Sequence, residues 1–144
     1  MTLKKFNIRI YGLLIEDEKI LIVDEIVRGS PVTKFPGGGL ELGEGPIDCI
    51  VREFLEETGM QVQVTEHFYT TDFFQQSAFN ADDQIISIYY KLQRTGELKP
   101  NHLLPVNETE TLLGLRWLPL RELTVETVHL PIDKVVVRKL MERI

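Results

Sequence analysis

The segment Pro46–Thr58 constrains the fold most, because it predicts an amphipathic helix with well-defined ends. Apolar residues recur at helical spacing and form one face: Ile47, Ile50, Val51, Phe54 and Leu55. Proline suits the first helical position, where its missing N–H would have no partner anyway. Asp48 in the first turn complements the helix dipole, and Gly59 suits the left-handed residue that follows a helix end.

The remaining segments predict mainly strands. Phe6–Ile15 and Ile20–Val27 form a predicted hairpin around a polar turn, and a glycine-rich loop follows at Lys34–Gly39. Three later strands, two loops and a closing helix are expected at Met60–Gln75, Ser77–Asp83 (loop), Ile85–Leu92, Thr95–Asn107 (loop), Leu112–Leu118 and Pro131–Ile144. Strands and helices do not alternate regularly, which favours a mixed α/β (α+β) architecture in a single domain over residues 1–144.

Composition excludes several classes of protein. Apolar residues make up 43% and charged residues 26% of the 144 residues, which argues against disorder or a fibrous repeat. The net charge of −6 argues against nucleic acid or a membrane surface as a partner. The single cysteine, Cys49, excludes an internal disulfide and is expected to be a buried thiol. No targeting segment is visible, so a cytoplasmic protein is expected.

Three glutamates on the predicted helix suggest a cation site. Glu53, Glu56 and Glu57 stand at positions i, i+3 and i+4, so their carboxylates share one face. Like charges at this spacing repel each other, and acidic residues in the last turn of a helix oppose its dipole. A cation against this face would offset both costs, and oxygen ligands suit Mg²⁺ or Mn²⁺.

The spacing around these glutamates resembles a known motif. Gly38, Glu44 and the run Arg52-Glu53-Phe54-Leu55-Glu56-Glu57-Thr58-Gly59-Met60 match the box of the Nudix hydrolase family, G-x5-E-x7-R-E-U-x-E-E-x-G-U, where U is a bulky aliphatic residue. Every fixed glycine, glutamate and arginine is present, while Phe54 and Met60 replace aliphatic residues. Phe35-Pro36-Gly37-Gly38 and the segment around Trp117 also resemble the family.

The resemblance implies a fold, a reaction and roles for residues. The Nudix fold is a mixed sheet sandwiched between helices, and the family hydrolyses a nucleoside diphosphate linked to another moiety. By this resemblance Glu53, Glu56 and Glu57, with the carbonyl of Gly37, hold Mg²⁺ or Mn²⁺. Arg52 orients the glutamates and Glu44 braces the loop. The general base stays open between a box glutamate such as Glu53 and a later glutamate, Glu110 or Glu108.

The sequence constrains the substrate only loosely. Arg28, Lys34 and Gly38 are candidates for binding a small-molecule nucleotide, and Phe73, Phe74, Phe79 and Tyr89 are either base-stacking or core residues. ADP-ribose, a nucleotide sugar and a nucleoside triphosphate all remain candidate substrates, because marks of individual subfamilies are not evident. A nucleotide-sensing module without catalysis is the alternative, and the oligomeric state is open, a homodimer included.

Overall fold

The computed structural model describes residues 2–96 and 110–143. Along the chain its elements are β1 (Lys5–Glu16), β2 (Lys19–Val27), β3 (Ser30–Lys34), β4 (Gly37–Gly39), α1 (Pro46–Thr58), β5 (Val62–Thr70), β6 (Asp83–Arg94), β7 (Glu110–Pro119), a short 3-10 turn (Leu120–Glu122) and α2 (Pro131–Glu142). The mixed architecture that the sequence predicts is therefore confirmed.

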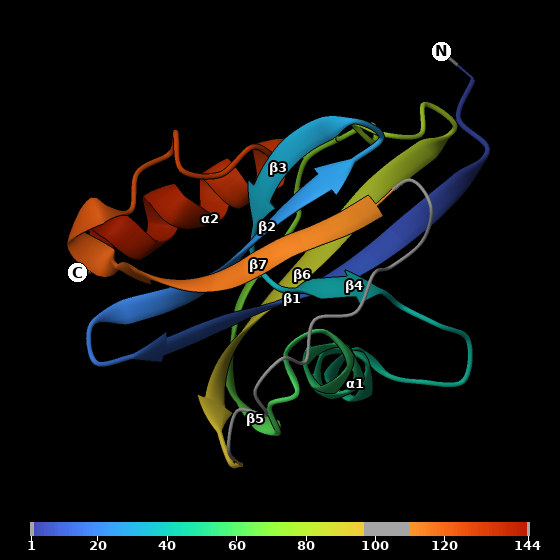
Figure 1. The fold of residues 1–144 in the computed structure, drawn as a ribbon. Helices are drawn as coiled ribbons and strands as arrows, with labels where there is room; N and C mark the ends of the chain where they lie inside the picture. The colour runs from blue at the N-terminus through green and yellow to red at the C-terminus, as the bar shows by residue number, and fades with distance from the viewer. Residues whose placement is uncertain (1, 97–109, 144) are drawn as a thin grey trace.

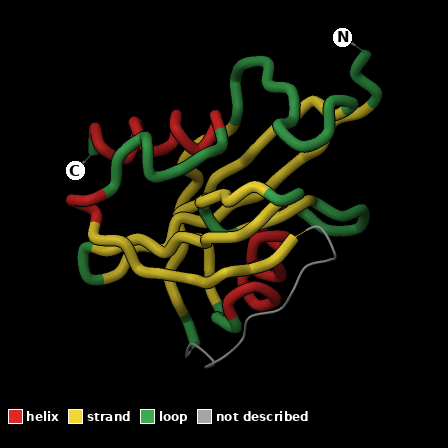
Figure 2. Tube along the Cα trace, turned by 45° about the horizontal axis from the view of Figure 1, so that its top comes forward, coloured by secondary structure: helices red, strands yellow, loops and turns green. Residues whose placement is uncertain are grey.

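A mixed sheet lies between the two helices (Figures 1 and 2). Its main path runs β3-β2-β1-β6-β5, while β4 pairs with β1 and β7 pairs with β2. The long neighbours β1 and β6 are parallel, and the other pairs are antiparallel. In Figure 1, β4 lies directly above α1, which places the three glycines of β4 against the helix that carries the glutamates.

Alternation along β1 divides the core in two. Ile10 and Leu14 pack on one face of the sheet with Ile50 and Phe54 of α1, because successive strand residues point to opposite faces. On the other face, Tyr11 and Leu13 pack with apolar residues of α2, which are Ile132, Val136, Val137 and Leu140. Ile50 and Phe54 of the predicted apolar face of α1 are thus confirmed as core residues. Ile47 and Leu55, predicted for the same face, are instead exposed.

Two strands were missed by the sequence analysis. The break at Arg28-Gly29 is a tight turn with φ of 50° and 83°, after which β3 returns along β2. Positive φ at two successive residues is typical of a two-residue hairpin turn, and Pro31 is tolerated because β3 is an edge strand. The predicted glycine-rich loop is also partly a strand, since Gly37–Gly39 forms β4 against β1.

The predicted strand Met60–Gln75 is too long. Strand β5 covers only Val62–Thr70. At Thr71 the regular backbone pairing ends, because the N–H of Ser87 in β6 donates to the hydroxyl of Thr71 at 2.8 Å. Phe73 and Phe74 consequently lie exposed in a loop and are not core residues. The predicted loop Thr95–Asn107 lies mostly outside the described residues.

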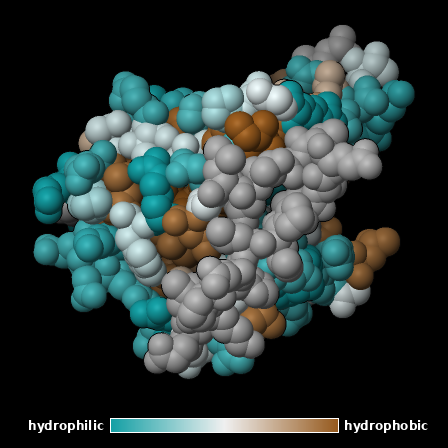
Figure 3. Space-filling model, viewed as in Figure 1, coloured by the Kyte–Doolittle hydropathy of each residue, from teal (hydrophilic) through white to brown (hydrophobic). Residues whose placement is uncertain are grey.

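The surface carries no large apolar face in the view of Figure 3, where the coloured atoms are mostly hydrophilic with small hydrophobic patches. Exposed large apolar side chains come from separate parts of the chain, such as Phe6, Leu42 and Phe74. Within residues 2–96 and 110–143, neither helix has the length and apolar character needed to span a membrane.

Gly12 provides a test of how closely α1 packs on β1. A Cβ at this position would lie 2.4 Å from Leu92 Cδ1 and 2.5 Å from Phe54 Cε2. We expect Gly12→Ala to lower the free energy of unfolding by about 1–3 kcal/mol, the usual cost of overpacking a core. Gly114→Ala, whose Cβ would meet nothing within 4 Å, is the matched control and should be close to neutral. Urea unfolding of both variants measures this, and equal stability would contradict the packing.

Candidate active site

Arg52 is the centre of a network that joins the loop before α1 to the glutamates on α1. Its Nε and Nη2 donate to the two carboxylate oxygens of Glu44 at 3.0 and 2.7 Å, a bidentate pair. Its Nη1 donates to Glu53 at 2.9 Å and to Glu56 at 3.2 Å. Nη2 also donates to the carbonyl of Gly39 at 3.2 Å. One guanidinium thus fixes the loop, strand β4 and two of the three box glutamates.

The charges in this network support one another. The hydrogen bond from Arg52 lowers the pKa of Glu44 to about 2, and the N–H of Glu41 also donates to Glu44. Cys49 of α1 lies next to this network, with its Sγ 3.5 Å from the carbonyl oxygen of Gly39. Burial raises the pKa of its thiol to about 12. The predicted buried thiol is confirmed.

Strand β4 lies against α1 through groups of its own backbone. The N–H of Gly37 donates to Glu57 Oε2 at 3.1 Å, while the carbonyl of Gly39 accepts from Arg52. At Gly38 a Cβ would come within 2.4–2.5 Å of the carboxylate of Glu53. Glycine at this position therefore leaves the space that the Glu53 carboxylate fills.

Glu57 lies between this network and a buried ion pair. Lys34 Nζ lies 3.3 Å from Glu25 Oε1, and both side chains are buried. Burial raises the pKa of Glu57 to about 7, although the nearby charge of Lys34 opposes this shift. Burial also raises the pKa of Glu53, against the effect of Arg52. Two carboxylates are thus held where their negative charge is costly.

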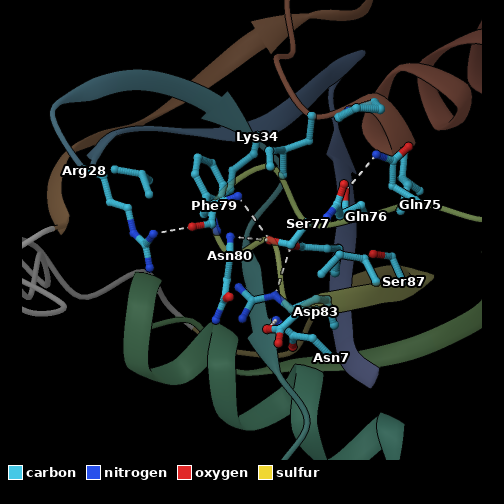
Figure 4. A pocket seen from close by; sticks show the side chains of 18 of the residues that line it. Asn7, Arg28, Lys34, Gln75, Gln76, Ser77, Phe79, Asn80, Asp83 and Ser87 are labelled. Atoms are coloured by element: carbon cyan, nitrogen blue, oxygen red, sulfur yellow. Dashed lines mark hydrogen bonds between the residues drawn. The ribbon is translucent and has the colours of Figure 1, made fainter. Parts of the chain in front are cut away.

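A cavity of about 270 Å³ opens on the α2 side of the sheet next to Lys34 (Figure 4). Asn7, Arg9 and Tyr11 of β1 line it, as do residues of β2, β6, the loop 75–80 and the start of α2. Figure 4 shows Asn7 beside Asp83, to which its amide donates at 3.4 Å. Polar and apolar residues contribute about equally to the cavity wall, and the cavity adjoins the glutamate cluster through Lys34.

Comparison with known proteins identifies this arrangement. The family model of the NUDIX domain matches residues 5–140. The chain belongs to the Nudix family. It is 30% identical over 100 residues to the 8-oxo-dGTP diphosphatase of Escherichia coli (strain K12), covering 68% of this chain and 73% of that relative. The pyrophosphate-hydrolysing family and the enzyme class that the sequence predicts are thereby confirmed.

Solved structures share the Nudix fold. A NUDIX hydrolase from Nitrosomonas europaea superimposes with a TM-score of 0.79 at 22% identity, over 96% of this chain and 90% of that one. The E. coli ORF135 protein superimposes with a TM-score of 0.74 at 19% identity, over 97% and 91% of the two chains. At these identities the likeness establishes the fold alone.

The Nudix glutamates fit a divalent cation in their chemistry, although the described residues contain no group of three His, Cys, Asp or Glu side chains arranged to hold one. Glu53 and Glu57 are partly buried carboxylates whose raised pKa values show that their charge is poorly compensated. Oxygen ligands of this kind suit Mg²⁺ or Mn²⁺. Arg52 holds Glu53 and Glu56 in the metal-free arrangement.

The other predicted site residues fall in different places. Lys34, a candidate for binding the nucleotide, is buried and paired with Glu25 at the cavity wall. Arg28 is exposed and donates to the carbonyl of Phe79 at the edge of the cavity (Figure 4). Glu110 begins β7, where its backbone pairs with cavity-lining Val27. Glu108 lies outside the described residues.

Sequence reasoning missed several residues at this site. Arg9, Asn7 and Glu25 lie in strands, where their polar character signals only an exposed face. Their convergence depends on the pairing of β1 with β4 and β6, which no spacing along the chain reveals. A polar residue on alternate positions of an otherwise apolar strand, such as Asn7 and Arg9 before Tyr11, is the one available signal.

Replacing Glu57 tests whether its charge strains the metal-free protein. A raised carboxylate pKa stabilises the folded state at low pH, and that stabilisation is lost as the pH rises through about 7. Glu57→Gln removes this titrating group. In EDTA, the free energy of unfolding of the variant relative to wild type should therefore rise by about 1 kcal/mol from pH 5 to pH 8.5. Denaturant unfolding at both pH values measures this gain.

With Mg²⁺ the wild type should become the more stable of the two proteins, because a ligand of the folded state stabilises the wild type and binds the variant poorly. If wild type is the more stable protein in EDTA at pH 8.5, the hydrogen bond from Gly37 outweighs the cost of burying the charge. In that case Glu57 would be a structural residue and not a strained ligand.

Proposed function

We propose that this protein hydrolyses a nucleoside diphosphate linked to another moiety, with Mg²⁺ or Mn²⁺ as the cofactor. The observation that carries the proposal is the set of box carboxylates held by Arg52 at the edge of β4, beside a cavity of about 270 Å³. The products are a nucleoside monophosphate and the phosphorylated second moiety. Water attacks one phosphorus, the bridging P–O bond breaks, and the leaving phosphate takes the electron pair.

The residues of the chain divide the work between metal binding and positioning. Glu53, Glu56 and Glu57 would hold the cation, with the carbonyl of Gly37 as a further ligand. When bound, the cation neutralises phosphate oxygens and lowers the pKa of water. Arg52 holds Glu53 and Glu56 at a fixed position relative to the loop before α1, and the N–H of Gly37 donates to Glu57 Oε2. The proton of the attacking water goes to a carboxylate oxygen of Glu53, Glu110 or Glu108.

Nucleoside triphosphates are the first substrates to test. Support comes from the E. coli relative, which is named an 8-oxo-dGTP diphosphatase, and from a cavity near the small end of the range for ligand pockets. ADP-ribose and nucleotide sugars belong in the same screen. Residues Arg28, Lys34 and Gly38 would contact the substrate, Lys34 through its buried ammonium at the cavity wall. By the same proposal the protein acts in the cytoplasm, as a monomer or a homodimer.

Hydrolysis should depend on the divalent cation. With millimolar Mg²⁺ or Mn²⁺ at least one substrate of the screen should yield a nucleoside monophosphate, and EDTA should stop the reaction. Glu53→Gln should lower turnover by at least about 100-fold, because a carboxylate is lost from the reacting centre. Product formation is followed by chromatography. Folded wild type that turns over nothing in the presence of metal, yet binds a nucleotide, would establish the sensing module instead.

The general base can be assigned by comparing three matched substitutions. If Glu110 or Glu108 accepts the proton, Glu→Gln at that position should lower turnover by about 10²–10⁴-fold while leaving the affinity for Mn²⁺ unchanged. Glu126→Gln, at an exposed position away from the cavity, is the control. Near-wild-type turnover in both the Glu108 and Glu110 variants would leave a box glutamate as the base.

A further inference from the structure

Arg9 occupies the part of β1 that faces the cavity. It lies between the other two cavity-lining residues of the strand, Asn7 and Tyr11, on the same face of the sheet. Its Nε donates to the hydroxyl of Tyr11 at 3.3 Å, and its guanidinium carbon lies 5.9 Å from the centre of the Tyr11 ring. Arg9 and its neighbour Tyr11 pair with Gly39 and Gly37 of β4, and the N–H of Gly37 donates to Glu57.

The glycines of β4 let Arg9 approach the glutamates. Arg9 is paired with Gly39, and a Cβ at Gly39 would stand only 3.3 Å from Arg9 Nη1. At the next position, Gly38, the space beside the strand is filled by the carboxylate of Glu53. Neighbouring strand residues point to opposite faces. Arg9 and Glu53 therefore reach the same short strand from its two sides.

The charges around Arg9 favour an anion as the ligand. Lys34 Nζ lies 5.5 Å from the centre of the same Tyr11 ring that Arg9 contacts, so two cations share one aromatic side chain. Glu25 neutralises Lys34 at 3.3 Å, and Asp83 is placed near Asn7 and Lys5. Arg9 lines the cavity, and its guanidinium stands beside β4 at Gly39, next to the glycine against which the carboxylate of Glu53 lies. A guanidinium fork matches phosphate oxygens in bidentate geometry.

Distances along β1 fit a nucleotide. Residues on one face of a strand are about 6.6 Å apart, so Asn7 and Tyr11 mark a span of about 13 Å with Arg9 at its middle. A phosphate bound to Arg9 would lie next to the glutamates. The nucleoside would extend in the opposite direction, toward the end of the cavity where Asn7, Asp83 and the loop 75–80 lie.

We propose that Arg9 is a substrate-binding residue that holds the phosphate which stays on the nucleoside, at the junction of the cavity and the carboxylate cluster. The proposal rests on the proposed function for the kind of ligand, but it concerns binding and not the chemical step. Arg9 would orient the nucleoside phosphate relative to the glutamates. It should therefore contribute to affinity for the product as well as for the substrate.

Product binding tests this inference separately from turnover. Isothermal titration with GMP and AMP, and with guanosine and adenosine, would be done on the wild type, Arg9→Met and Arg9→Lys in both EDTA and Mg²⁺. Arg138→Met, an exposed arginine on α2 away from the cavity, is the matched control. We expect Arg9→Met to weaken binding of the monophosphate by about 10- to 100-fold, the loss of a charge-assisted contact. Nucleoside affinity should change less than about twofold, and Arg9→Lys should restore part of the loss.

Several outcomes would overturn the proposal. If Arg9→Met lost affinity for the nucleoside and for the monophosphate by the same factor, Arg9 would be a structural residue of the cavity wall. Unchanged monophosphate affinity, or a wild type that binds monophosphate no better than nucleoside, would also exclude the role. If Arg9→Met does not fold, Arg9→Lys decides through the same ratio of affinities. Absence of turnover in the wild type would instead count against the proposed function.

Discussion

The hydrogen bonds of Arg52 are the interaction on which the rest of this site depends. A single guanidinium holds Glu44 of the loop, Glu53 and Glu56 of α1, and the carbonyl of Gly39 in β4. Loop, helix and strand are thereby fixed at one point, so the box glutamates stand at a defined place on the sheet edge. Lysine has no planar fork and offers a single charged nitrogen, so it cannot make this set of contacts at once.

Three glycines in succession make that arrangement sterically feasible. Gly38 leaves room for the carboxylate of Glu53, and Gly39 leaves room for the guanidinium of Arg9 on the other face. The backbone of β4 then satisfies its polar groups with side chains, since Gly37 donates to Glu57 and Gly39 accepts from Arg52. Burying Glu57 in this position raises its pKa to about 7. Under the proposed function, this shift is the cost of holding carboxylates ready for a cation.

Local signals predicted the parts of the fold that depend on nearby residues. Helix α1 begins at Pro46 and ends before Gly59, whose φ of 74° is the left-handed conformation that its position suggested. The extent of β5 and the presence of β3 and β4 depend on pairing between distant segments, so residue type alone did not reveal them. For the same reason the box glutamates were found from their spacing, whereas Arg9 and the burial of Lys34 emerged only from the sheet.

The most direct test of the central claim is the turnover of Arg52→Lys at saturating Mg²⁺ and substrate. This substitution keeps the positive charge but removes the fork that joins loop, helix and strand. If the geometry held by Arg52 positions the glutamates, turnover should fall by at least about 10-fold, the equivalent of one lost charge-assisted hydrogen bond. A folded Arg52→Lys protein with wild-type turnover would contradict the claim, because charge alone would then suffice.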